Sequence, residues 1–198
     1  NGNKDIVQLL LTYPNIELNA ISNTGMTAFM WACKNGNKDV VQLLLSEPNI
    51  KLNARDNDGW TAFMLACLNG HTDVVKLLVN HASIDLKVKC NDGKTALMLA
   101  CIQGQTDVVQ LLLDDSDKAV GLNARDNDGE TAFMWACFNG HTDIVKLLLE
   151  HSNQRIEVKS CMDCRQDQED IIQLLLEYSH IEIIDVSSQD DCLFLFRH

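Results

Sequence analysis

Short apolar runs alternate with polar turns along most of this chain, and the runs take two distinct forms. The clearest copy covers residues 125–149, RDNDGETAFMWACFNGHTDIVKLLL. Its first run, residues 132–137, is almost wholly apolar, which predicts a helix buried on most sides. Its second run, residues 142–149, carries charge only at Asp143 and Lys146, so we expect an amphipathic helix whose charged residues face water.

The same segment recurs three more times upstream. Residues 55–79 are a near-duplicate, and residues 23–45 and 91–113 are looser versions. The register is marked by glycines spaced 34, 34 and then 36 residues apart, namely Gly25, Gly59, Gly93 and Gly129. The two extra residues of the last interval fall within residues 114–121. Self-similarity at a period of this length predicts a stacked solenoid.

Each unit carries its own start and stop signals. A threonine stands before every first helix, where its hydroxyl can accept a hydrogen bond from a free backbone N–H group; these are Thr27, Thr61, Thr95 and Thr131. An Asn-Gly or Gln-Gly pair follows that helix and predicts its end. In three of the four units the connector ends in Asn-Asp-Gly, a tight-turn signal. The unit is therefore predicted to be helix, turn, helix and projecting hairpin.

Four segments of the second unit identify a family. They are residues 56–62 (DNDGWTA), 65–67 (LAC), 69–71 (NGH) and 74–78 (VVKLL), and the frame recurs over roughly residues 1–149. This pattern closely resembles the ankyrin repeat. It departs from the family in having Thr-Ala-Phe-Met or Thr-Ala-Leu-Met in place of Thr-Pro-Leu-His. The resemblance implies an all-α ankyrin-repeat solenoid of helix-turn-helix units joined by β-hairpin-like loops.

Internal alignment divides the chain into parts of one elongated array. We expect the second half of a repeat at 1–22, repeats at 23–56, 57–90, 91–124 and 125–158, a degenerate repeat without its first helix at 159–180, and a truncated tail at 181–198. The missing helix should leave an apolar notch near Phe133 and Phe138. We hypothesise that residues 193–196 fold back into this notch as a cap; the alternative is a frayed end.

Charge and hydropathy exclude some classes of partner. With 28 acidic and 16 basic residues the net charge is −12, and Lys and Arg are scattered, which argues against nucleic-acid binding. No apolar run reaches the length of a membrane span, so no membrane insertion is expected. The chain opens on Asn-Gly-Asn-Lys, which is unlike a signal peptide.

Half of the eight cysteines occupy one repeat position: Cys33, Cys67, Cys101 and Cys137. Equivalent positions of stacked helices lie about 10 Å apart, whereas a disulfide needs Cα atoms within about 7 Å. We therefore expect buried free thiols and a reducing, cytoplasmic compartment.

In ankyrin arrays the hairpin tips and the exposed side of the first helices form a concave binding surface. By position, the resemblance predicts a partner-binding set of Met26, Asn57, Asp58, Trp60, Leu68, Asn91, Asp92, Lys94, Ile102, Asn127, Asp128, Glu130 and Phe138. The same slots also hold Asn23, Thr24, Lys34, Asn35, Asn69, Gln103 and Asn139. The apolar members, rimmed by Asp and Asn, suit an apolar or amphipathic peptide, with or without basic flanks. The alternative is that they only cover neighbouring repeats.

Other conspicuous residues are interpreted as structural. Trp31 and Trp135 fill a slot that holds leucine in other repeats, so core packing is expected. His71 and His141 stand where amides stand elsewhere, which favours a hydrogen bond in the turn. Cys161 and Cys164 form a CxxC pair without a second pair, which favours an irregular loop over a zinc or redox site. No catalytic arrangement, metal site or cofactor is predicted.

The resulting prediction is a monomeric, non-enzymatic scaffold that binds a partner protein or peptide on its concave face. Two alternatives stay open: the substrate-recruiting region of a larger enzyme, such as a ubiquitin ligase or kinase, and a structural tether.

Overall fold

The predicted apolar runs form short helices whose ends coincide with the predicted capping residues. The computed structural model describes residues 3–114 and 121–151. Within these ranges the helices are α1 (Lys4–Leu11), α2 (Ala28–Lys34), α3 (Lys38–Leu45), α4 (Ala62–Leu68), α5 (Thr72–Val79), α6 (Ala96–Ile102), α7 (Thr106–Asp114), α8 (Ala132–Phe138) and α9 (Thr142–His151). Strand pairing in this part of the chain is limited to one bridge between Ile21 and Thr27.

The predicted N-caps are confirmed. The Thr61 hydroxyl accepts a hydrogen bond from the Met64 backbone N–H at 3.3 Å, and the same bond recurs at the start of α2, α6 and α8. This bond satisfies a donor that the helix itself leaves unpaired. At the other end of α4, Gly70 has φ of 70°, in the left-handed region that glycine adopts readily.

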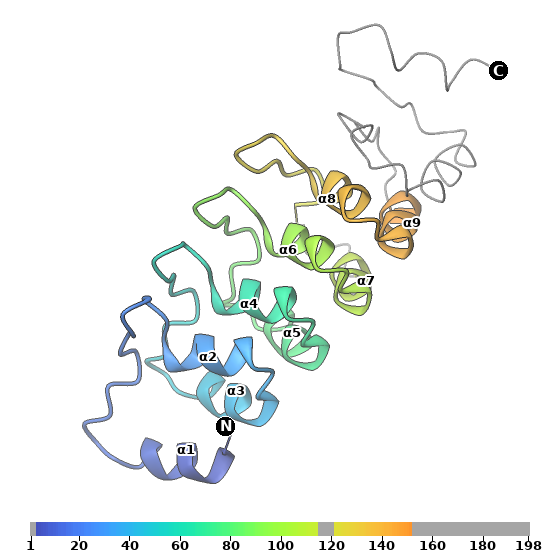
Figure 1. Cartoon of the computed structure of the whole chain (residues 1–198). Helices are drawn as coiled ribbons and strands as arrows, with labels where there is room; N and C mark the ends of the chain where they lie inside the picture. The colour runs from blue at the N-terminus through green and yellow to red at the C-terminus, as the bar shows by residue number, and fades with distance from the viewer. Residues whose placement is uncertain (1–2, 115–120, 152–198) are drawn as a thin grey trace, which may run out of the picture.

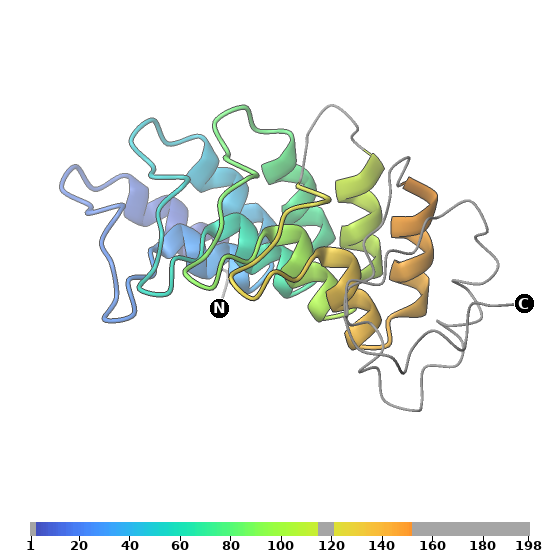
Figure 2. The same ribbon diagram turned by 90° about the horizontal axis from the view of Figure 1, so that it is seen from above.

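The helices form two parallel rows (Figure 1). The inner row is α2, α4, α6 and α8, each packed on the next, and the outer row is α1, α3, α5, α7 and α9. The loops that precede the inner helices project from the same side of the array. Seen from above, the helix pairs still follow one another in chain order (Figure 2). The predicted all-α solenoid is confirmed.

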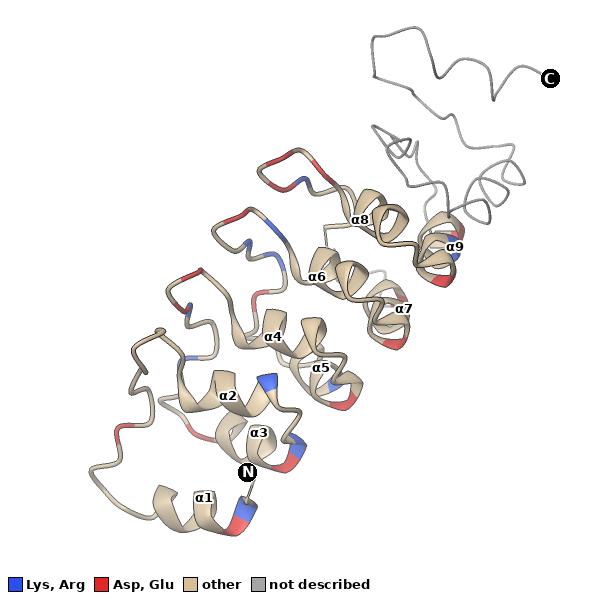
Figure 3. Ribbon diagram, viewed as in Figure 1, with Lys and Arg blue, Asp and Glu red and all other residues tan. Residues whose placement is uncertain are grey.

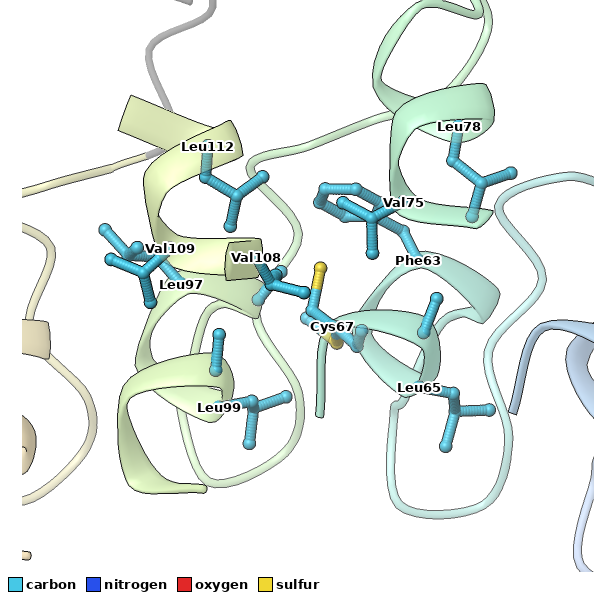
Figure 4. Close-up of a cluster of buried hydrophobic side chains, with 14 of the residues drawn as sticks. Phe63, Leu65, Cys67, Val75, Leu78, Leu97, Leu99, Val108, Val109 and Leu112 are labelled. Carbon is cyan, nitrogen blue, oxygen red and sulfur yellow. The ribbon is translucent and has the colours of Figure 1, made fainter. Parts of the chain in front are cut away.

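The core lies between successive helix pairs and runs the length of the array. Figure 4 shows Phe63, Cys67 and Val75 of one pair facing Val108 and Leu112 of the next, and all five are at most 2% exposed. Met26 also lies in this core. Apolar area removed from water at these interfaces is the main favourable term for stacking.

The four equivalent cysteines are buried in the core without a disulfide bond, as predicted. Burial raises the pKa of the Cys33, Cys67 and Cys101 thiols, and for Cys67 the neighbouring Cys33 adds to the rise. These groups therefore stay protonated and behave as small apolar side chains.

Adjacent hairpin tips are joined by a ladder of hydrogen bonds. The Asn91 backbone N–H donates to the Asp58 carbonyl at 3.0 Å, and the Asn91 side-chain Nδ2 donates to the Asn57 carbonyl at 3.1 Å. The same pair of bonds joins Asn57 to the tip before it, and Asn127 to the tip of Asn91. Each asparagine thus fixes the spacing of two repeats.

At the first three tips a glycine makes room for the asparagine of the next repeat. Gly93 has φ of 80°, and a Cβ placed on it would lie 2.5 Å from the Asn127 Oδ1 atom and 2.7 Å from the Asn127 backbone nitrogen. Both distances are far below van der Waals contact, so a side chain at this position would push the next repeat away.

A second ladder joins the turns between the two helices of each repeat. The His71 Nε2 atom lies 2.8 Å from the Lys34 carbonyl, and the His141 Nε2 atom lies 3.2 Å from the Ile102 carbonyl. Gln105 Nε2 donates to the Leu68 carbonyl at 3.1 Å in the equivalent place. The prediction that the two histidines form turn hydrogen bonds is confirmed, and their acceptors belong to the preceding repeat.

A third set of hydrogen bonds joins successive connectors, and it depends on an asparagine that one repeat lacks. Asn53 Nδ2 donates to the Ser83 carbonyl, and Asn53 Oδ1 accepts from the Asp85 N–H. Asn19 makes the same pair of bonds one repeat earlier. Lys87 occupies this position in the following repeat, and an ammonium group cannot accept the second bond.

Several predictions concern residues that the structure does not describe. The degenerate repeat at 159–180, the tail at 181–198, the Cys161–Cys164 pair and the cap formed by residues 193–196 all lie outside the described residues. The exact repeat boundaries also stay predictions.

Two glycine substitutions test whether the tip contact controls stacking. Gly129→Ala adds a Cβ that meets nothing within 4 Å among the described residues. It should therefore lower the free energy of unfolding by only about 1 kcal/mol, the cost of a side chain in the left-handed backbone conformation. Gly93→Ala should lose roughly 1–3 kcal/mol more, because its Cβ overlaps Asn127. Urea unfolding of both variants measures the difference. Equal losses would show that the overlap is relieved without disturbing the stack.

Candidate functional site

Three rows of repeat positions, whose side chains differ in exposure, lie along the surface formed by the inner helices and the bases of the hairpin loops, here called the inner face. The loop-base row is Met26, Trp60, Lys94 and Glu130; the mid-helix row is Trp31, Leu65, Leu99 and Trp135; the helix-end row is Lys34, Leu68, Ile102 and Phe138. The mid-helix and helix-end positions are three residues apart, so they share one side of each inner helix.

The helix-end row is the most accessible apolar part of the inner face. Phe138 is 61% exposed at the end of α8. Leu68 and Ile102 are half-buried and pack partly on the core. The ring of Phe138 meets Trp135 edge to face, with 6.0 Å between ring centroids.

The mid-helix row is uneven, and Trp31 is its exposed member. Leu65 and Leu99 are 5% and 2% exposed, whereas Trp31 is 43% exposed. The expectation that Trp31 belongs to the core is therefore wrong. An indole is much larger than the leucine side chain that fills this slot elsewhere, so it extends beyond the packed layer.

Trp135 occupies the same slot but is held by a charged network and is half-buried. Its Nε1–H donates to the Asp126 Oδ2 atom at 2.9 Å. The Lys94 ammonium lies 3.6 Å from that oxygen and 5.0 Å from the centroid of the Trp135 ring. The Asp126 side chain is fully buried, and these contacts together with backbone donors compensate its charge.

No such network holds Trp31. The residue equivalent to Asp126 is Ser22, whose hydroxyl accepts from the Met26 N–H at 3.2 Å. The only cation near the Trp31 ring in the described part of the chain is Lys34, with its ammonium 5.0 Å from the ring centroid. The two tryptophans therefore differ in what holds their side chains, although they share a repeat position.

The predicted binding residues fall into three groups. Met26 is only 6% exposed, so the prediction that it lines the surface is wrong: its side chain packs into the core of the first repeat. The tip asparagines are exposed, but their amides donate to the preceding tip; these are Asn57, Asn91 and Asn127. The accessible or half-buried remainder is Asp58, Trp60, Leu68, Asp92, Lys94, Ile102, Asp128, Glu130 and Phe138.

Metal-ion sites and membrane-spanning helices are absent from the described residues. No group of three or more His, Cys, Asp or Glu side chains there is arranged to hold a metal ion. None of the described helices is long and apolar enough to cross a membrane.

Comparison with known proteins identifies the repeat. The family model described as "Ankyrin repeats (3 copies)" matches residues 1–56, 51–122, 82–160 and 118–190. A search of curated proteins found no match.

The charged network around Trp135 predicts an unequal effect of two equivalent aspartates. Asp126→Ala should lower the free energy of unfolding by about 3 kcal/mol, because it leaves Lys94 largely buried without its carboxylate. Asp56→Ala should lose only about 1 kcal/mol, since Asp56 accepts two backbone N–H bonds and forms no ion pair in the described structure. Chemical denaturation of both variants decides. A loss for Asp126→Ala no larger than for Asp56→Ala would mean that the ion pair adds no stability.

Proposed function

Because this chain belongs to the ankyrin repeat family, whose repeats are generally protein–protein interaction modules, we propose that it binds a segment of a partner protein across its inner face without catalysing a reaction. The matches extend over residues 1–190, so the proposal concerns the greater part of the chain.

The exposed aromatic residues of the inner face carry this proposal. Phe138 is 61% exposed and Trp31 is 43% exposed, on helices whose other apolar side chains are mostly buried. Large aromatic side chains left in water are disfavoured unless something covers them, and they are the residues that most often dominate the energetics of protein interfaces.

Half-buried side chains join the two exposed aromatic residues into one surface. Trp60, Leu68 and Ile102 lie in the repeats between Trp31 and Phe138 and pack partly on the core. Because these side chains are held in place by the core, a partner would meet a preformed apolar surface. Few side chains of this protein would then lose conformational freedom on binding. A rigid surface of this kind suits an apolar or amphipathic peptide segment.

We also propose that the chain works as a monomer in the cytoplasm. Support for the compartment comes from the cysteines: Cys33, Cys67, Cys90 and Cys101 are buried thiols without disulfide bonds, as is usual where the environment is reducing. Size-exclusion chromatography with light scattering tests the oligomeric state.

A displayed random-peptide library tests the inner face directly. Peptides selected on the wild-type chain are measured against a Trp31→Lys/Phe138→Lys variant whose helix content is checked by circular dichroism. We expect at least about 30-fold weaker binding, corresponding to about 2 kcal/mol from interface hot spots. The control is Tyr13→Lys, because Tyr13 is 58% exposed but lies outside the inner helices.

The control should bind the selected peptides as the wild type does. If the double variant also keeps wild-type affinity for every selected peptide, the inner face is not the binding surface and the proposal fails.

A further inference from the structure

Lys34 gives one end of the inner face a positive charge. It is the only charged member of the helix-end row, where the later repeats have Leu68, Ile102 and Phe138. Its ammonium lies over the Trp31 ring, and no salt bridge to it is found within residues 3–114 and 121–151. The aromatic ring stabilises the cation without neutralising it, so the charge is available to a partner.

The other lysine of the inner face is not available in this way. The Lys94 ammonium is paired with the buried Asp126 carboxylate at 3.6 Å, and its side chain is 16% exposed. Its charge is therefore already compensated within the array. Lys34 and Lys94 differ in this respect although both lie over a tryptophan ring.

The hairpin tips add negative charge, but not at the first repeat. The first tip carries Thr24, whereas the next three carry Asp58, Asp92 and Asp128, all exposed. Figure 3 shows this difference: the tip before α2 is uncharged, the tips before α4, α6 and α8 carry acidic residues, and a basic residue ends α2. The inner face is thus positive beside Trp31, whereas the tips of the three later repeats each carry an exposed aspartate.

From this arrangement we infer that the partner segment is itself charge-polarised: a carboxylate side chain beside Lys34 and Trp31, apolar side chains along the inner helices, and lysine or arginine facing the tips of Asp92 and Asp128. The inference rests on the proposed function and adds the partner's chemistry and direction. A uniformly basic segment would place a cation against Lys34, and that like-charge contact disfavours it.

The repeat spacing sets the length of such a segment. Packed helices lie about 10 Å apart, so the first and fourth repeats are separated by roughly 30 Å. An extended chain advances about 3.3 Å per residue, so the acidic and basic ends should be roughly nine residues apart. A helical segment would need about twenty residues, at about 1.5 Å each.

Selection from a random 16-residue peptide library, displayed on phage, tests the inference. The targets are the wild-type chain, Lys34→Glu and Lys34→Met. The wild type should enrich peptides with Asp or Glu at one end and Lys or Arg roughly nine residues away. Lys34→Glu should replace the acidic preference by a basic one, and Lys34→Met should abolish it, while the preference at the other end persists.

A binding cycle on one selected peptide makes the assignment specific. Replacing its acidic residue by alanine should weaken binding about tenfold to the wild type and less than twofold to Lys34→Met. The control is Lys76→Glu, since Lys76 is exposed on the outer helix α5 and should leave the selected sequences unchanged.

Two failures can be told apart. Selected peptides that depend on Trp31 and Phe138 but show no acidic preference, and no response to Lys34→Glu, would overturn the inference and leave the proposed function standing. Peptides whose binding ignores Trp31 and Phe138 would overturn both.

Discussion

Stacking of each helix pair on the next is the interaction on which the rest of the structure depends, because no pair buries its own apolar surface. The ladders at the hairpin tips and at the helix–helix turns hold this stacking in register. They use residues whose geometry leaves little choice: a glycine in the left-handed region and, one repeat later, an amide or imidazole that fills the space above it. Apolar burial supplies the driving force for stacking, and the ladders set the spacing of the repeats.

A fixed register makes the inner face a surface of interchangeable positions. The same backbone slot holds leucine at 65 and 99 and tryptophan at 31 and 135 without a change in how the inner helices pack. What differs is the surroundings: Trp135 is tied to Asp126 and Lys94, and Trp31 has only Lys34 over its ring. The surroundings of a side chain in such an array therefore depend on which residue occupies a second repeat position, as Asp126 does for Trp135.

Local signals explain what could be predicted from the sequence. Thr61 as a cap follows from chemistry within one turn of chain and is found. A hydrogen bond from His71 was also predicted and is found, but its acceptor, the Lys34 carbonyl, lies in the preceding repeat. The exposure of Trp31 could not be read from its slot, because Trp135 fills the same slot and is half-buried; the two differ in that Ser22 stands where Asp126 bonds to Trp135. The role of Asn91 in stacking could have been predicted from the sequence. An asparagine recurs unchanged at that position in every repeat, whereas residues that contact a partner are expected to vary.

Lys87 marks the place where the array tolerates a change of length. Where asparagine clamps a connector, at 19 and 53, the repeat measures 34 residues. After Lys87 the interval grows to 36, yet Asn127 still bonds to the preceding tip and α8 still packs on α6. Among the four aligned repeats, the two added residues thus fall in the connector that comes one repeat after Lys87. The inner helices therefore keep the same packing across a change in repeat length.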